Sequence, residues 1–396
     1  MNAIDSMTLR ELHAEKQAVE DMIARMGAAM TRGCNWLVSQ FAPHGPIMSA
    51  HDVSYCHKVT WGLFEDGRLE ACEQILDWLD SHAKQGVARY FFPEEPPFNR
   101  VMQLLYRFLT FGKVAEALRH PKFTTDEIRA EVLTYQHPSG GVYGNKDEAE
   151  YRATVNPLIT SFLTEWALPA GLMEPAKRSG DFLAMMVELN EPHMSAEPGR
   201  FYYLWDTATE QLVTEAKPGE DLNCFVDTEG AKQHFYHIGC ALAALADLYA
   251  ATGEARYLAA AEKLAEFETR LNPEGLYWPS WCKIGWGSAE LYRVTGKPRD
   301  RVAAANVSLV TFMGAQTAAG GWEDMYYPLR DHGAWEQVRY DGRGLVPETL
   351  PDDGSWAWLS GHEISGEFLG EMGRTRKCFQ EALNRIERRI AELAPR

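Results

Sequence analysis

Residues 242–271 read LAALADLYAATGEARYLAAAEKLAEFETRL and decide the fold. Apolar residues recur at helical spacing on both sides of Thr252-Gly253. Glycine directly after a helical run favours a helix end, because glycine adopts the left-handed conformation without a steric penalty. The stretch therefore predicts two helices joined by a tight turn. A second copy spans residues 284–312, with Thr295-Gly296 at its turn.

The same pattern repeats along the chain, with two kinds of break in alternation. Short turns holding one glycine are predicted at Gly67, Gly112, Gly171, Gly253, Gly296 and Gly373. Longer breaks that combine glycine with aromatic residues include Tyr90, Tyr143, Tyr203, Trp278 and Trp322. Successive helical hairpins run up and down, so we expect the short turns at one end and the long loops at the other. Six hairpins that stack on their neighbours predict an all-α fold, an (α/α)6 toroid of two concentric helical rings. An open helical array is the structural alternative.

The toroid is expected to span residues 49–396 as a single domain, with an N-terminal helix within residues 1–48 packed on its outer ring. Several of the first helices of the hairpins are rich in small residues, as in Gly239-Cys240-Ala241, which suits a close-packed inner ring. The second helices, such as residues 254–271 and 374–393, carry more charge and suit an outer ring that faces water.

Composition excludes several classes of protein. The chain has 396 residues, a formal net charge of −17 and 45% hydrophobic residues, which is too apolar for a disordered chain. The acidic balance argues against binding to a nucleic-acid backbone. No stretch is apolar enough to span a bilayer, and the N-terminus lacks the features of a signal peptide. Seven scattered cysteines suggest reduced thiols, and these features together predict a cytoplasmic protein. We expect its partner to be a small-molecule substrate. Whether it forms a homo-oligomer stays open.

Two loops resemble a known repeat. Residues 312–322, FMGAQTAAGGW, resemble the QW repeat of squalene–hopene cyclases and related α/α-toroid proteins, and residues 135–143, YQHPSGGVY, are a second copy with Tyr143 in place of tryptophan. The size of the chain is similar to single-toroid enzymes such as linalool dehydratase-isomerase. A weaker resemblance links Pro192-His193-Met194 and Gly361-His362-Glu363 to N-acylglucosamine 2-epimerases. These resemblances imply a toroidal enzyme; no counterpart of the linalool enzyme's catalytic cysteines can be placed.

If the long loops share one rim, the starts of the inner helices converge on one cavity. Candidate catalytic groups are the acids and imidazoles expected there: Asp324, Asp353, His237, His362, Asp52 and Glu363. Candidate substrate-binding residues are Tyr55, His57, Arg100, Asn156, Tyr236, Cys282, Trp286, Trp322 and Trp356. A rim carboxyl, Asp324 or Asp353, would donate a proton if burial raised its pKa, and His237 or His362 would take a proton up.

Each candidate also has a structural interpretation. Asp52 suits a helix N-cap, Trp322 can brace the ring, and the two helical histidines can be ordinary core residues. Histidines such as His234 and His237 lie three apart without a glutamate or cysteine at ligand spacing, so we expect no metal and no cofactor.

Three functions compete at this stage. The first is a metal-independent isomerase or lyase of the cyclase or dehydratase type, which acts on a terpenoid or prenylated metabolite, because aromatic faces stabilise a carbocation. The second is an epimerase-like or other six-hairpin sugar enzyme. The third is a non-catalytic helical scaffold, which would favour an open array.

Overall fold

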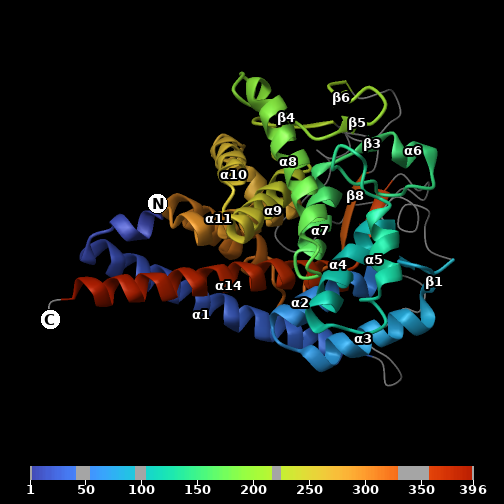
Figure 1. Cartoon of the computed structure of the whole chain (residues 1–396). Helices are drawn as coiled ribbons and strands as arrows, with labels where there is room; N and C mark the ends of the chain where they lie inside the picture. Colours follow the sequence, from blue (N-terminus) through green and yellow to red (C-terminus); the bar gives the residue numbers. More distant parts are fainter. Residues whose placement is uncertain (1, 42–53, 94–103, 216–223, 329–355, 395–396) are drawn as a thin grey trace.

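The computed structural model describes residues 2–41, 54–93, 104–215, 224–328 and 356–394. Within these ranges, two sets of helices alternate along the chain (Figure 1). The inner set comprises α2 (Ser54–Glu65), α4 (Leu104–Leu118), α7 (Pro157–Ala167), α9 (Tyr236–Thr252), α11 (Cys282–Thr295) and α14 (Gly361–Leu393). The outer set comprises α1 (Leu9–Ser39), α3 (Leu69–His82), α5 (Asp126–Leu133), α8 (Met173–Met194), α10 (Ala255–Glu268) and α12 (Pro298–Val307).

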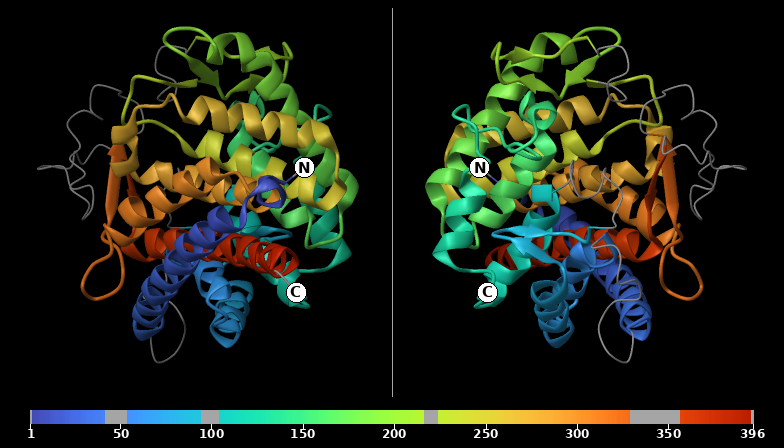
Figure 2. Two further views of the ribbon diagram at one scale, coloured as in Figure 1. Left: turned by 90° about the vertical axis from the view of Figure 1, so that its left-hand side faces the viewer. Right: turned by 90° about the vertical axis from the view of Figure 1, so that its right-hand side faces the viewer.

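The inner helices form a closed ring. Each one contacts the next in chain order, and α14 contacts α2, which brings the last inner helix back to the first. This order can be followed by colour in Figures 1 and 2. The fold is therefore the all-α, (α/α)6 toroid that the repeat predicts, and the open array is wrong. None of the described helices combines the length and the apolar character needed to cross a membrane.

Glycine permits the close approach of the inner helices. A Cβ atom on Gly239 of α9 would lie 2.2 Å from the backbone of Lys283 on α11, so a larger residue would push the two helices apart. The expectation that this small-residue stretch belongs to the inner ring is thus confirmed.

The two kinds of break lie at opposite ends of the ring. Gly67, Gly171, Gly253 and Gly296 follow the ends of inner helices with φ of 78°, 73°, 72° and 67°. We call this side the short-turn end. The long breaks with Tyr143, Tyr203, Trp278 and Trp322 precede the starts of inner helices, at what we call the long-loop end.

Short antiparallel strands lie between an outer helix and the next inner helix, at the long-loop end. They are β1 (Lys84–Gly86) with β2 (Arg89–Tyr90); β3 (Thr154–Val155), β5 (Trp205–Asp206) and β6 (Gln211–Leu212); β4 (Arg200–Tyr202) with β7 (Phe225–Asp227); and β8 (Met325–Pro328) with β9 (Trp356–Leu359). The remaining elements are α6 (Ala149–Arg152), the 3-10 turns η1 (Ala3–Ser6), η3 (Pro273–Tyr277) and η4 (Pro279–Trp281), and the π-helical turn η5 (Ser308–Met313).

The two QW-like loops are held in the same way. The amide nitrogen of Gln316 donates to the carbonyl oxygens of Gly320 (2.7 Å) and Ala29 of α1 (2.9 Å). The amide nitrogen of Gln136 donates to the carbonyl oxygens of Gly140 (3.3 Å) and Pro175 of α8 (3.0 Å). In each loop the glutamine therefore ties the loop backbone to an outer helix.

Two of the predicted short turns are wrong. Gly112 lies inside α4 and Gly373 lies inside α14, so both helices continue through their glycines. Packing explains both positions, because a Cβ on Gly112 would lie 3.1 Å from the Phe108 ring and a Cβ on Gly373 would lie 2.3 Å from Cβ of Glu65. α4 ends six residues later, at Leu118, before Arg119 with φ of 54°.

The prediction that residues 374–393 form a separate outer helix is also wrong, since α14 runs without a break from Gly361 to Leu393. α1, from the other end of the chain, packs along α14 instead, and the Lys16 ammonium lies 2.7 Å from the Glu387 carboxylate. Figure 1 shows both helices side by side, extending past the other inner helices. The division at residue 48 stays a prediction, because that residue lies outside the described ranges.

Candidate functional site

Two lysines and three glutamates from three inner helices lie together inside the ring. Glu363, Glu367 and Glu371 are spaced by four residues on α14, which places them on one face of the helix. The Lys58 ammonium of α2 lies 2.9 Å from Glu363 and 2.7 Å from Glu367. The Lys283 ammonium of α11 bonds to Glu367 and Glu371. All five residues are buried, and we call them the axial cluster.

The charges in the axial cluster differ from group to group. Burial alone would raise the pKa of Glu367, but Lys283 and Lys58 outweigh it and lower the pKa to about 2. Burial raises the pKa of Glu371, against the opposing effect of Lys283, and its Oε2 atom has no hydrogen-bond partner. Burial opposes the charge on both lysines, but the glutamates raise their pKa values well above the usual range. Glu371 is therefore a carboxyl suited to carry a proton.

One set of potential metal-ligand atoms lies within the described residues. Atoms of Cys282, Glu367 and Glu371 lie within 4.8 Å of one another, and all three residues are buried. The Lys283 ammonium already bonds to both carboxylates, so this lysine supplies the positive charge that a metal ion would bring. Burial also raises the pKa of the Cys282 thiol, which disfavours the thiolate that a metal needs.

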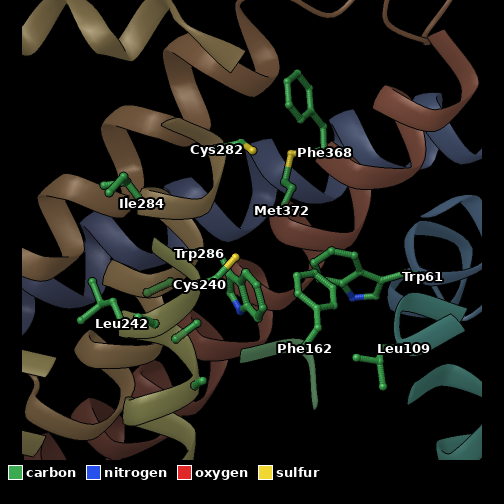
Figure 3. Close-up of a cluster of buried hydrophobic side chains, with 14 of the residues drawn as sticks. Trp61, Leu109, Phe162, Cys240, Leu242, Cys282, Ile284, Trp286, Phe368 and Met372 are labelled. Atoms are coloured by element: carbon green, nitrogen blue, oxygen red, sulfur yellow. The ribbon is translucent and has the colours of Figure 1, made fainter. Parts of the chain in front are cut away.

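Three aromatic rings fill the middle of the ring. The Trp61 ring lies 5.4 Å from the Trp286 ring and 6.2 Å from the Phe162 ring, centroid to centroid. Figure 3 shows the three side chains converging from α2, α7 and α11. The Trp61 centroid lies 5.8 Å from Nζ of Lys283 and 3.4 Å from Nζ of Lys113. The aromatic trio therefore has a lysine of the axial cluster near it, and a second lysine from the third turn of α4.

Imidazole and phenol groups gather at the start of α9. The His237 ring stacks on the Tyr203 ring with centroids 3.9 Å apart, and Tyr236 lies 4.6 Å away. The Tyr203 hydroxyl lies 3.1 Å from Nδ1 of His234. Burial lowers the pKa of His237 well below its usual range, and Nδ1 of His237 has no hydrogen-bond partner among the residues that the structure describes. Cys240 lies one turn further along α9, on the same face of the helix as His237. Cys240 is within electrostatic range of Lys283, so this face of α9 is turned toward the axial cluster.

His57 of α2 and Glu363 of α14 lie close together, with His57 Nε2 3.7 Å from Glu363 Oε1. His362 does not join them. Its ring stacks on Trp36 of the outer helix α1, with centroids 5.1 Å apart, because neighbouring residues of a helix point in different directions.

Other candidates have structural roles. Asp324 is exposed, and its carboxylate accepts a 2.6 Å hydrogen bond from the Gly361 amide at the start of α14, so the burial required for a proton donor is lacking. Asn156 caps α7 by accepting from the Ile159 amide. Trp322 is buried and donates to the Phe312 carbonyl at 2.9 Å, which makes it a brace of the ring. Trp286 belongs to the buried aromatic trio.

Some candidates cannot be placed. Asp52, Arg100 and Asp353 lie outside the described residues, and for Tyr55 and Trp356 the structure describes the backbone alone. The donor proposed at Asp353 and the positions assigned to Arg100 and Trp356 therefore stay predictions.

A cavity of about 400 Å³ lies at the short-turn end. Among the candidate site residues with described side chains, His237, Cys282, Trp286 and His362 do not line it. Its lining comes from the far ends of the inner helices and includes Trp61, Phe64, Glu65, Lys113, Val114, Ala117, Glu165, Leu168, Pro169, Asp247, Ala250, Ala251, Arg293 and Arg374.

Sequence reasoning missed most of the inward charges. The spacing of Glu363, Glu367 and Glu371 was a usable signal, because three glutamates on one face of a helix that also holds glycines imply partners across a close-packed interface. Lys58 and Lys113 gave no such signal, since single lysines on amphipathic helices normally face water.

Comparisons with known proteins support the fold. A search with protein-family models and a search of curated proteins find no match. Among solved structures, the chain is similar to the type II terpene cyclase MstE from Scytonema, with 13% identity, a TM-score of 0.54 and coverage of 91% of this chain and 99% of that one. It is also similar to a D-mannose isomerase (9% identity, TM-score 0.57, coverage of 89% and 97%). A family 76 glycoside hydrolase from a bovine Bacteroides thetaiotaomicron strain aligns with 11% identity, a TM-score of 0.53 and coverage of 88% and 76%. The neighbours are α/α-toroid enzymes, and at these identities the likeness shows the fold alone.

Proposed function

We propose that the protein is a metal-independent, acid–base isomerase or lyase that acts on a hydrophobic small molecule, such as a terpenoid or prenylated metabolite. The substrate would bind at the long-loop end, above the axial cluster. His237 carries the proposal: it is a buried imidazole that stays neutral, stacks on a phenol ring and has no hydrogen-bond partner at Nδ1 within the described part of the chain. A neutral imidazole in that position is suited to accept a proton from a bound molecule.

A proton donor is needed on the other side of the substrate. His57 beside Glu363 is the pair we propose, because Nε2 of this buried imidazole lies 3.7 Å from the Glu363 carboxylate, so the two groups could exchange a proton. Lys58 holds the Glu363 carboxylate in place at 2.9 Å. We therefore propose the buried pair of His57 on α2 and Glu363 on α14 as the proton donor, in place of the exposed Asp324.

Aromatic groups support a hydrophobic substrate. The rings of Tyr203 and Tyr236 flank His237, and aromatic faces stabilise positive charge that develops on carbon. Both lysines of the axial cluster are already paired with glutamates, so they offer little to a sugar's hydroxyl groups. One structural neighbour, the terpene cyclase, acts on this class of molecule according to its name.

A sugar enzyme remains the second candidate. Tyr203, His234 and His57 supply polar atoms near the starts of the inner helices, and the D-mannose isomerase and the glycoside hydrolase among the neighbours are sugar enzymes by name. Two-base proton transfer by His237 and His57 would suit an epimerase as well as a terpenoid isomerase.

A paired substrate panel tests the proposal. Wild-type protein is incubated with terpenoid alcohols and prenyl diphosphates in one series, and with monosaccharides and their N-acetylated amines in the other. Products are separated by chromatography and detected by mass spectrometry. We expect turnover in the first series and a loss of about a hundredfold to ten-thousandfold in His237→Asn. The control is His13→Asn, which alters an exposed histidine of α1. Turnover confined to the sugar series, or a folded His237→Asn variant with wild-type rates, would overturn the proposal.

A further inference from the structure

The cavity at the short-turn end is lined by two buried charged groups, Lys113 and Glu165, that form no ion pair among the described residues. Its volume of about 400 Å³ falls within the range of roughly 300–1,000 Å³ that is typical of small-molecule sites. The walls mix apolar residues such as Phe64, Leu168 and Pro169 with acids and bases. The site lies on the far side of the ring from His237, so it is independent of the proposed function.

The first of these groups is Lys113. Its side chain is buried (7% exposed), and its ammonium lies 3.4 Å from the Trp61 centroid, 4.9 Å from Phe162 and 5.3 Å from Trp286. No hydrogen-bond acceptor among the described residues is within reach of Nζ. Aromatic faces offset part of the cost of burying an ammonium, but they do not replace an anion.

The second group is Glu165 of α7, which lines the same cavity. It is also 7% exposed, and its Oε1 atom has no hydrogen-bond partner. Glu165 and Lys113 interact electrostatically, yet they form no ion pair within 4.0 Å. Within the described residues, a gap of more than 4.0 Å therefore separates the Lys113 ammonium from the Glu165 carboxylate, and both groups line the cavity.

The other charges around the cavity are already paired. Asp247 lies 2.8 Å from Arg374 and also bonds to Arg293, and both arginines bind Glu290 as well. Glu65 lies 2.6 Å from Lys377. Lys113 and Glu165 are thus the two lining charges left for a ligand, and they have opposite signs.

We propose that this cavity binds a small zwitterion, namely an amino acid with an apolar side chain. Its carboxylate would bind Lys113, its ammonium would bind Glu165, and its side chain would pack against Trp61, Leu168 and Pro169. A single molecule of this kind neutralises both buried charges at once. It also fills the space that keeps them apart.

Calorimetric titration of the full chain tests the proposal, with L-leucine, L-methionine and L-phenylalanine as probes. L-leucinamide lacks the carboxylate, and N-acetyl-L-leucine lacks the ammonium. We expect at least one amino acid to bind, and each of the two leucine analogues to bind about tenfold to a hundredfold more weakly than leucine, as expected for the loss of one charge-assisted hydrogen bond.

Two variants assign the contacts. Lys113→Met should bind leucine and leucinamide alike, and Glu165→Gln should bind leucine and N-acetyl-leucine alike. Lys122→Met and Glu174→Gln, which alter two exposed charges elsewhere, should leave the affinities unchanged. The proposal is overturned if none of the three amino acids binds at millimolar concentration, if the analogues bind as well as leucine, or if both cavity variants bind like wild type. The analogue comparison uses wild-type protein, so it holds even if one variant fails to fold.

Discussion

Glu363 of α14 binds Lys58 of α2 through an ion pair of 2.9 Å, and this pair joins the last inner helix of the ring to the first. Lys58 also binds Glu367 one turn further along, and Lys283 continues the chain of charges to α11. The axial cluster thus links three helices that lie far apart in sequence. Buried ion pairs contribute little net stability when complete, but a single missing partner leaves an uncompensated charge.

We therefore expect Lys58→Met to lower the free energy of unfolding by about 3–5 kcal/mol, because Glu363 and Glu367 would lose a buried partner. Urea denaturation followed by circular dichroism measures the change. The control is Lys16→Met, which breaks the partly exposed pair with Glu387 and should cost less than about 1 kcal/mol. Equal effects of the two substitutions would show that the axial cluster does not hold the ring together.

Lys113 gives a pH-dependent prediction. Burial lowers its pKa to about 8, with Glu165 and Glu65 opposing that effect and Arg374 and Lys283 adding to it. An unfolded lysine keeps its proton up to about pH 10.5, so the unfolded state binds more protons than the folded state between pH 8 and 10.5. The buried charge therefore destabilises the ligand-free protein fully below pH 8, and this penalty disappears as the pH rises to 10.5.

Lys113→Met removes the penalty. In ligand-free protein we expect this variant to melt about 2–4 °C above wild type at pH 7, and the difference to vanish near pH 10.5. Differential scanning calorimetry across this pH range measures it, and Lys122→Met should show no such trend. A variant that melts below wild type at pH 7 would mean that the cation–π contacts with Trp61 outweigh the desolvation of Lys113.

The QW-like loops give a prediction about stability alone. Gln316→Leu removes the hydrogen bonds between its side chain and Gly320 and, through Ala29 and Arg32, α1, so we expect the free energy of unfolding to fall by about 1–3 kcal/mol. Gln136→Leu should behave alike, since its contacts to Gly140 and α8 are equivalent. Gln380→Leu on the exposed face of α14 is the control. A null result for both loop variants would show that the repeated motif does not brace the ring.

The sequence predicted the ring because its turns are local features. Gly253 and Gly296 act through their own φ angles, and Gln136 and Gln316 act within loops of a few residues, so both signals survive without knowledge of distant contacts. Gly112 and Gly373 do not end their helices. Each lies inside a helix and makes room for packed side chains, including Trp166 of α7 at Gly112 and Glu65 of α2 at Gly373. A glycine that makes room for Glu65 looks in sequence like a glycine that ends a helix.

The candidate site was less predictable because it depends on partners from different helices. His237 was a candidate because it lies near the predicted start of an inner helix, and its catalytic role stays a prediction. Lys58 and Lys283 became significant only once the fold placed them against Glu367, and Lys113 only once α4 faced Trp61. His362 was expected to point into the central cavity, but its ring stacks on Trp36 of α1. The next residue, Glu363, is the one that faces the inside of the ring and binds Lys58.

Deuterium incorporation from solvent tests the central claim, which is proton transfer by His237 at the long-loop end. Product formed by wild-type protein in D2O should carry deuterium on carbon, at the position where the bond moves or the ring closes. His237→Asn should retain the fold and incorporate deuterium at a rate about a hundredfold to ten-thousandfold lower, while His13→Asn matches wild type. For an isomerisation or a cyclisation, product free of solvent deuterium, or equal incorporation by His237→Asn and wild type, would contradict the account. For a dehydration, which forms no new C–H bond, an unchanged rate of product formation by His237→Asn would contradict it.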